Sequence, residues 1–287
     1  MRHPESHMPH DTPLIRFGAI ADPQYAPLPP NLQLNRYFAK SLEKLDEAIA
    51  VFNAEDLSFV VTLGDLVDRG FENFGAVLAR YAPLHHENIL LPGNHDFLVA
   101  PEELSQVHAR LSMPAPYHHF SRCGLRFVVI DGNEESLFAT PEDTPAHKRA
   151  HARLKALETA GAANAQSWNG GISQEQAAWL ANVLSDAAAA DEKVVVLGHY
   201  PLYPPNDHNL WDWQQLVDLF ERSGNVVAYL NGHNHAGNLG RHGTTWYVNL
   251  KGMVDTEREN AFAIAEVFAD RLVITGFGRE ESRSLPF

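Results

Sequence analysis

Five short apolar runs, each followed at once by a turn that carries Asp, Asn, Gln or His, constrain the fold of this chain most. The turns are Asp22-Pro23-Gln24, Gly64-Asp65-Leu66-Val67-Asp68, Gly93-Asn94-His95-Asp96, Gly198-His199 and Gly232-His233-Asn234-His235. Short apolar runs that end at glycine are typical of buried strands. Because ligands bind at the carboxyl ends of strands in open α/β sheets, the pattern predicts that these polar side chains meet at one edge.

The rest of the chain alternates strand-like and helix-like segments and then changes to strand hairpins. Strands are expected at 14–21, 57–63, 88–91, 125–130, 193–197, 226–230, 244–250, 261–268 and 272–276, and helices at 36–53, 73–81, 173–186 and 211–223. The helix expected at 173–186 has a capping-box signature, with Ser173 at the N-cap and Gln176 three positions later. This order of elements predicts a mixed α/β layered fold.

The expected domain organisation is simple. Residues 1–13 form a leader rich in Pro and His, which we expect to be disordered because it offers too few apolar side chains for a core. Residues 14–287 form a single domain. The irregular region at about 132–172, with a charged and alanine-rich stretch that can form a helix, is expected to be an insertion beside the main sheet.

Composition excludes several classes of protein. The net charge of −14 disfavours broad binding to nucleic acid or to an anionic membrane, because no excess of Lys and Arg is available to replace counterions. The single cysteine, Cys123, excludes an internal disulfide and a multi-cysteine zinc site. No apolar run approaches the roughly 20 residues of a membrane span, and the start lacks an apolar signal segment. A cytoplasmic protein is therefore expected.

The side chains in the five turns form a set of metal ligands without a thiolate. Carboxylate, amide and imidazole donors suit Mn²⁺, Fe and Zn²⁺. Seven such donors exceed one tetrahedral site but suit two metals about 3.5–4 Å apart that share one carboxylate. Two divalent cations would supply the local positive charge that an anionic substrate needs, and would lower the pKa of a bridging water so that it can attack phosphorus.

In chain order, the five blocks resemble the pattern of the calcineurin-like metallophosphoesterases: D-x-H, G-D-x-x-D, G-N-H-D/E, G-H and G-H-x-H. Gln24 stands where most of that family has histidine. This replacement, together with the segment W-N-G-G-I-S-Q-E-Q at 168–176, is similar to the manganese-dependent ADP-ribose/CDP-alcohol diphosphatase subgroup. The resemblance implies a four-layer α-β-β-α sandwich of two mixed sheets.

The resemblance also implies a ligand set. One metal would take Asp22, Gln24, Asp65 and His235, and the other would take Asp65, Asn94, His199 and His233, so that Asp65 bridges the two. Mn²⁺ is the favoured metal, with Fe or Zn²⁺ as alternatives. His95 is expected to assist the leaving group as a general acid or a cation, and Asp68 to orient it.

Four further residues are candidates for binding the substrate. Arg69 and Arg36 could contact phosphate through their planar guanidinium groups. Trp168 and Asn169 could meet a nucleobase or a ribose. A surface salt bridge is the alternative for either arginine, and a plain core position is the alternative for Trp168.

The function implied by the resemblance is a dinuclear metal-dependent phosphohydrolase. It would cleave the phosphoanhydride of ADP-ribose, CDP-alcohols or similar nucleoside diphosphate derivatives by attack of a metal-bound hydroxide. A phosphodiesterase or phosphomonoesterase on the same metal centre, acting on a cyclic nucleotide or a phosphoprotein, is the alternative. A non-catalytic scaffold on the same fold is a third alternative, which is disfavoured because every block retains a residue that can bind metal. The expected partner is a small nucleotide-type phosphate, with neither nucleic acid nor membrane.

Overall fold

Two six-stranded sheets pack face to face in the computed structural model, which describes residues 12–287. The expected leader thus falls almost entirely outside the described residues. The first sheet has the order β12-β11-β10-β1-β2-β3 and the second β4-β5-β6-β7-β9-β8. The strands of the first sheet are β1 (Ile15–Ile20), β2 (Phe59–Leu63), β3 (Glu87–Leu91), β10 (Ala261–Val267), β11 (Arg271–Gly278) and β12 (Arg283–Pro286). Those of the second are β4 (His118–Arg122), β5 (Leu125–Val129), β6 (Lys193–Leu197), β7 (Val226–Asn231), β8 (Asn238–His242) and β9 (Thr245–Asn249).

Both sheets are mixed. In the first, β1, β2 and β3 run parallel, while β10, β11 and β12 follow as antiparallel neighbours. In the second, β5, β6, β7 and β9 run parallel, and the edge strands β4 and β8 are antiparallel to their neighbours. The parallel strands of each sheet therefore deliver the residues that follow them to a common edge.

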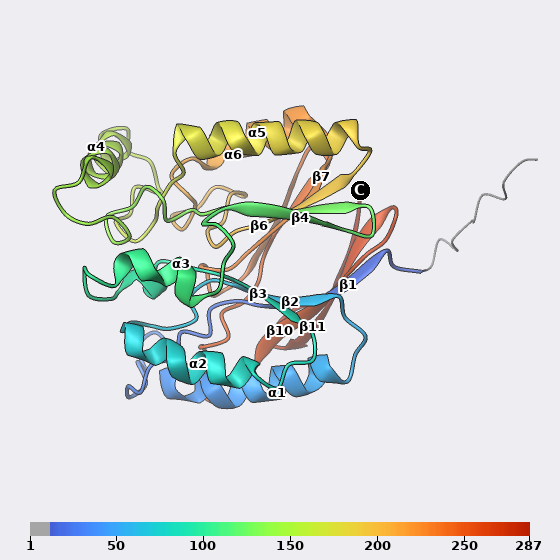
Figure 1. The fold of residues 1–287 in the computed structure, drawn as a ribbon, viewed down its shortest axis with the longest axis horizontal. Coiled ribbons are helices and arrows are strands. Elements are labelled where there is room, and N and C mark those ends of the chain that lie inside the picture. The colour runs from blue at the N-terminus through green and yellow to red at the C-terminus, as the bar shows by residue number, and fades with distance from the viewer. Residues whose placement is uncertain (1–11) are drawn as a thin grey trace, which may run out of the picture.

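Helices cover the outer faces of both sheets, so the expected four-layer α-β-β-α sandwich is confirmed (Figure 1). Beneath the first sheet lie α1 (Ser41–Asn53) and α2 (Phe74–Tyr81), and the short α3 (Val107–Arg110) lies to the left of its strands. Above the second lie α5 (Gln174–Ala189) and α6 (Trp213–Ser223). Helix α4 (Pro145–Thr159) stands to one side of this upper layer. Single 3₁₀ turns occupy Phe38–Lys40, Phe71–Asn73, His95–Phe97 and Leu104–Gln106.

Three apolar clusters hold the layers together. The cluster between the sheets contains stacked and edge-on phenylalanines, with ring centroids 4.8 Å apart for Phe17 and Phe59 and 5.1 Å apart for Phe59 and Phe127. A second cluster joins α1, through Leu45 and Phe52, to the outer face of the first sheet. A third joins α5 and α6 to the second sheet. Burial of each large side chain contributes roughly 1.5–3 kcal/mol, so these clusters supply most of the stabilisation of the sandwich.

The sequence did not predict the edge strands β4, β8 and β12. Apart from the buried Leu285, their side chains are exposed or partly buried and many are polar, so these strands lack the continuous apolar run that marks the central strands. The first helix also begins at Ser41, later than predicted. Arg36 instead pairs its backbone with Asn31 across a tight loop.

The predicted capping box at the start of α5 is only half formed. The hydroxyl of Ser173 accepts from the backbone N–H of Gln176 at 3.0 Å, as expected. The side chain of Gln176 does not return to Ser173, because it is used by Asp131 and Glu134. Glu134 accepts from the Ser173 N–H instead, at 2.9 Å. A carboxylate distant in the sequence thus replaces the local partner.

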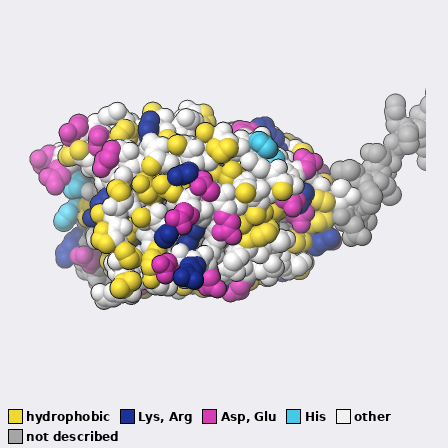
Figure 2. All heavy atoms as spheres, turned by 90° about the horizontal axis from the view of Figure 1, so that it is seen from below, with side chains coloured by type: hydrophobic (Ala, Val, Ile, Leu, Met, Phe, Trp, Pro, Cys, Tyr) yellow, Lys and Arg dark blue, Asp and Glu magenta, His cyan; other side chains and the backbone are white. Residues whose placement is uncertain are grey.

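Two further features concern the helices and the distribution of charge on one face. From residue 12 onward, no helix is long and apolar enough to cross a membrane. On the lower face, which carries α1 and α2, basic and acidic side chains are interspersed with apolar ones (Figure 2). This face therefore shows no continuous basic area.

The buried Lys44 on α1 fixes the loop that follows β9. Only 3% of this residue is exposed, and its ammonium donates to the carbonyls of Met253, Asp255 and Thr256 at 2.7–2.8 Å. Three carbonyl acceptors match the three donors of an ammonium group. Lys44 thereby ties the helix layer to a loop beyond the sheet edge.

We predict that Lys44→Met lowers the free energy of unfolding by about 2–4 kcal/mol, because three buried carbonyls lose their donor. Urea unfolding followed by circular dichroism measures this. The control is Lys40→Met, whose half-exposed ammonium pairs with Glu43 on the surface and whose loss is expected to cost about 0–0.5 kcal/mol. Equal stability of the two variants would contradict the structural role of Lys44.

Candidate metal centre

The carboxyl ends of parallel strands from both sheets meet at one end of the sandwich, on the left in Figure 1. Several hydrogen bonds join the sheets there. The Nδ1 of His199, after β6, donates to the carbonyl of Leu63 at 2.8 Å. The backbone N–H of His233, after β7, donates to the carboxylate of Asp22 at 3.1 Å. Strands far apart in the sequence thus present their following residues to a common space.

All seven side chains expected to bind metal lie in this space. The potential ligand atoms of Asp65, His199 and His233 lie within 4.8 Å of one another. The remaining members reach this core or each other through short contacts: Gln24 Nε2 to Asp65 Oδ2 at 2.9 Å, Asn94 Oδ1 to His199 Nε2 at 3.2 Å, and His235 Nε2 to Asp22 Oδ1 at 3.7 Å. None of the seven residues is more than 9% exposed. A buried set of carboxylates, amides and imidazoles is a donor set for divalent cations.

The backbone is strained at four of these residues. Asp22, Gln24, Asp65 and His233 have φ values of 51°, 43°, 54° and 69°. Such left-handed conformations cost of order 1–3 kcal/mol each for non-glycine residues and cluster at functional sites. The turns after the strands therefore keep these side chains pointing inward at a cost in stability.

Glycines permit the close packing around Asp65. Gly64 adopts a φ of +92°, which suits glycine and sets the turn before the carboxylate. A Cβ at Gly93 would lie 2.2 Å from Asp65 Oδ1 and 2.5 Å from His199 Nε2. Only a residue without a side chain lets the two donors approach each other at this point.

Each of the three histidines has one ring nitrogen held by an acceptor. His199 Nδ1 donates to the Leu63 carbonyl, and His235 Nδ1 donates to the Asp255 carboxylate at 2.8 Å. His233 Nε2 lies 2.9 Å from the side-chain oxygen of Asn169. Partners of this kind select the tautomer and leave the other ring nitrogen free to act as a ligand.

The amide of Gln24 provides a further test of whether a metal fits. Its oxygen is buried without a hydrogen-bond partner, while its nitrogen faces Asp65 and His235. Amide nitrogen and oxygen have nearly the same shape, so turning the terminal group over would direct the oxygen at these two residues. In either orientation the amide oxygen lacks a donor, since it is unpaired as it stands and would face the Asp65 carboxylate after the turn, and a cation in the cluster would relieve this cost. The residues present therefore fit the metal centre that the sequence predicts.

His95 lies beside this cluster without belonging to it. Its backbone N–H donates to Asp65 at 2.9 Å, and its Nδ1 lies 3.0 Å from the carbonyl and 3.3 Å from the carboxylate of Asp68. Burial lowers the pKa of His95, but the negative charge of Asp65 and the hydrogen bond to Asp68 outweigh it and raise the pKa above its usual value. Burial likewise opposes ionisation of Asp68, but His95 and Arg69 lower its pKa. The pair therefore favours a charged imidazole against a charged carboxylate.

A cleft of about 460 Å³ opens onto these groups. Its lining combines ligand candidates with other residues: Gln24, Leu34, Arg36, Asn94, His95, Trp168, His208, His233 and His235. Arg36 and Trp168 are thus placed at the cleft, and Trp168 is 44% exposed rather than in the core. Arg69 is not part of the lining, and its Nε donates to Asp68 at 2.7 Å. Asn169 is fully buried beneath the cleft surface and contacts His233.

Two supporting residues were not identified from the sequence. Asp255 follows no apolar run, and only the fold brings it to His235. Asp96 stands within the third block but was given no role. Its buried carboxylate accepts from the N–H groups of Val67 and Gly93 at 3.0 and 2.9 Å, and burial together with the charge of Asp65 raises its pKa to about 7. Asp96 thereby joins the turns after β2 and β3.

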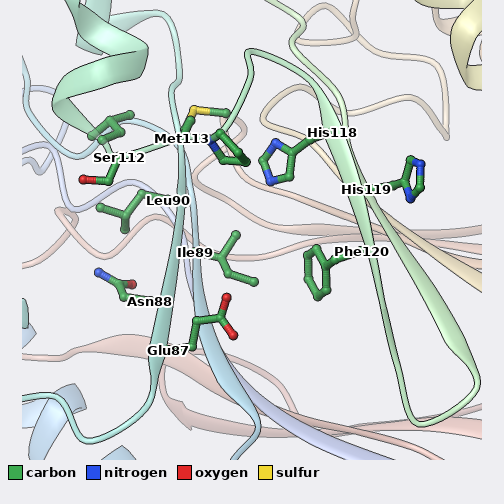
Figure 3. A pocket seen from close by; sticks show the side chains of 11 residues that line it. Glu87, Asn88, Ile89, Leu90, Ser112, Met113, His118, His119 and Phe120 are labelled. Carbon is green, nitrogen blue, oxygen red and sulfur yellow. The ribbon is translucent and has the colours of Figure 1, made fainter.

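A separate cavity lies between the edge strands β3 and β4 (Figure 3). Ile89 and Phe120 point into it from the two strands, with His118 and Met113 nearby. None of the expected site residues lines this cavity. The cleft over the metal ligands is therefore the cavity that brings the predicted site residues together.

Comparisons with known proteins agree with this arrangement. Residues 15–237 match the family model for calcineurin-like phosphoesterases. The manganese-dependent ADP-ribose/CDP-alcohol diphosphatase of Homo sapiens is 26% identical, over 99% of this chain and 96% of the human protein. Its Arabidopsis thaliana namesake is 29% identical, over 94% of this chain and 96% of the plant protein. The crystal structure of a dimetal phosphatase from Danio rerio superposes with a TM-score of 0.84 at 25% identity, covering 96% of this chain and 99% of the other.

We predict that Gly93→Ala weakens Mn²⁺ binding by about 10–100-fold, the range seen when groups that support metal ligands are changed, because the new methyl group displaces Asp65 or His199. Titration with detection of free Mn²⁺ by electron paramagnetic resonance measures this. The matched control is Gly75→Ala in α2, where the nearest atom to the new Cβ is the end of Arg110 at 3.5 Å. An unchanged Mn²⁺ affinity in Gly93→Ala would show that the ligands do not lie this close in solution.

Proposed function

Because this chain belongs to the calcineurin-like phosphoesterase family and is a metal-dependent phosphohydrolase, we propose that it cleaves the phosphoanhydride of nucleoside diphosphate derivatives such as ADP-ribose and CDP-alcohols. The resemblance to diphosphatases extends over nearly the whole length of both proteins, so it includes the loops around the cleft as well as the metal blocks. Those loops are where enzymes of one fold differ in substrate.

The observation that carries this proposal is the composition of the cleft. Its floor consists of ligand candidates and His95, and its walls offer the cationic Arg36 and the flat indole of Trp168. A substrate with a charged diphosphate at its centre and a planar base at one end matches this combination. A small phosphomonoester would leave the aromatic wall without a partner.

Two divalent metals would be held by the seven clustered side chains. Asp22, Gln24, Asp65 and His235 would hold one, and Asp65, Asn94, His199 and His233 the other. Burial would raise the pKa of the Asp65 carboxyl, but His199, His95 and His233 keep it far below its usual range, so Asp65 is an anion suited to bridging. When bound, the metals supply Lewis-acid activation of water and charge neutralisation at the phosphate. Mn²⁺ is the metal named for the diphosphatase relatives.

His95 and Asp68 would act on the leaving group. Donation from Nδ1 to Asp68 keeps the imidazole in one orientation and leaves Nε2 as the nitrogen that can meet a substrate oxygen. A proton held at Nε2 would pass to the departing phosphate oxygen as the bond to phosphorus breaks. Arg69 pairs with the other oxygen of Asp68, so its remaining N–H groups are available to a phosphate or to solvent.

The walls of the cleft would hold the rest of the substrate. Arg36 would contact a phosphate, and Trp168 would stack against a nucleobase. Asn169 was expected to contact the substrate as well. Its burial and its three hydrogen bonds instead suit a supporting role.

A Mn²⁺-supplemented screen tests the proposed substrate class. ADP-ribose, CDP-choline and CDP-glycerol are compared with cyclic nucleotides, p-nitrophenyl phosphate and a phosphopeptide. We expect the nucleoside diphosphate derivatives to give the highest kcat/KM, with a nucleoside monophosphate among the products. Preferential turnover of cyclic nucleotides or of the phosphopeptide would overturn the substrate class but leave the metal centre in place.

We predict that His95→Ala lowers kcat by about 10²–10⁴-fold, the usual contribution of general acid catalysis, while metal content is unchanged. Steady-state kinetics and elemental analysis of the same preparation measure the two effects. His242→Ala, which removes a surface imidazole paired with Glu221, is the control and keeps the parental kcat. Loss of metal from His95→Ala would reassign His95 to the ligand set.

A further inference from the structure

We infer that Asn169 is a positioning residue for His233, whose imidazole it holds with the proton on Nε2 and the lone pair on Nδ1. This inference rests on the proposed function, in which His233 binds a metal. It gives the 132–172 region a part in the metal centre, and it assigns Asn169 to the protein scaffold rather than to the substrate.

The side chain of Asn169 is completely enclosed. The residue has 0% exposure, and its amide makes three hydrogen bonds to three different segments. The nitrogen Nδ2 donates to the carbonyls of Asn164 at 3.1 Å and Asp207 at 2.7 Å. The oxygen Oδ1 lies 2.9 Å from Nε2 of His233. No group of this side chain faces the cleft.

These contacts fix the direction of every hydrogen bond. A backbone carbonyl only accepts, so two carbonyls on one side require the NH₂ group of Asn169 to be there. The amide oxygen must then face His233, and an oxygen of this kind also only accepts. Nε2 of His233 must therefore carry the hydrogen, and Nδ1 is left as the nitrogen with a free lone pair.

The surroundings of His233 leave few other means of holding its ring. The rings of Tyr200, His199 and His208 lie at 4.6, 4.9 and 5.4 Å from it, centroid to centroid, and constrain its plane without fixing its tautomer. Asp22 contacts His233 only through the backbone N–H. Among the hydrogen bonds of the described residues, the contact with Asn169 is the one that engages the His233 ring.

Asn169 resembles the Leu63 carbonyl that supports His199, since both are neutral amide oxygens, but it differs in chemistry from the group that supports His235. His235 is held by the carboxylate of Asp255, which adds negative charge and makes its imidazole more basic. His233 is held by a neutral amide, which orients the ring without adding charge. The two metal positions therefore receive histidines of different donor strength.

Asn169 is itself held firmly by the surrounding loops. The segment around it is joined to residues 207–212 by hydrogen bonds from Trp211 N to the Gly170 carbonyl at 2.8 Å and from Ile172 N to Asp212 Oδ2 at 2.9 Å. Asn164 adds a bond from its Nδ2 to the Leu210 carbonyl at 2.9 Å. These bonds make a rigid platform, so a small displacement of Asn169 relative to His233 is resisted.

Two measurements test the inference on the full chain. Long-range ¹H–¹⁵N spectra of the metal-free protein report the tautomer of His233, with the signal assigned by its loss in His233→Gln. We expect a hydrogen on Nε2. In Asn169→Leu, which keeps the side-chain volume and removes the acceptor, we expect mixed tautomers and a fall in Mn²⁺ affinity of about 10–100-fold.

Asn164→Leu is the matched control. It removes only one bond of the platform, from Asn164 Nδ2 to the Leu210 carbonyl, and retains the other two, the Asn164 backbone carbonyl and the contact between Asn169 and His233, so it is expected to keep the parental tautomer and Mn²⁺ affinity. A hydrogen on Nδ1 in the parental protein, parental Mn²⁺ affinity in Asn169→Leu, or an equal loss in Asn164→Leu would each overturn the positioning role. Failure of the parental protein to bind Mn²⁺ would overturn the proposed function instead, and the tautomer would still decide whether Asn169 orients His233.

Discussion

The buried carboxylate of Asp65 is the group on which the arrangement of the site depends. One oxygen accepts from the His95 backbone N–H, the other lies 2.9 Å from the side-chain amide of Gln24, and His199 of the opposite sheet lies 3.5 Å away. A charge with no exposure to water is tolerated only when surrounded by donors or cations. The first sheet supplies His95 and Gln24 and the second supplies His199 and His233, so the partners of this charge come from both sheets.

The strained turns at the carboxyl edge of the sheets lower the stability of the fold, and the packed sheets and helices raise it. Four left-handed residues and a tightly packed glycine at position 93 make the turns strained. The phenylalanine cluster between the sheets and the helix-covered outer faces offset that cost through burial of apolar surface. The rigid sandwich can hold a strained edge because few of the side chains that make the site also make the core.

Groups far from the five blocks complete the site. Lys44 holds the loop that carries Asp255, Asp255 holds His235, and Asn169 reaches His233 from a region that resembles an insertion. Each of these three residues supports a neighbouring group and does not itself line the cleft. Such supporting contacts determine how well ligand atoms are oriented, and hence how tightly a metal is bound.

The sequence by itself determined the central strands and the polar residues that follow them, including the seven clustered donors, whereas the order of the four layers was implied by the resemblance to a known family. The strands and the donors leave a local mark: an uninterrupted apolar run, a glycine, and a polar side chain immediately after it. The edge strands, the partner of Ser173 and the roles of Asp255 and Asn169 were decided only by the tertiary structure. Asn169 and His233 are 64 positions apart, and their contact exists only because two loops fold over the same sheet edge. Hydrogen bonds between distant segments leave no periodic signal in one chain, so no pattern in the sequence could predict them.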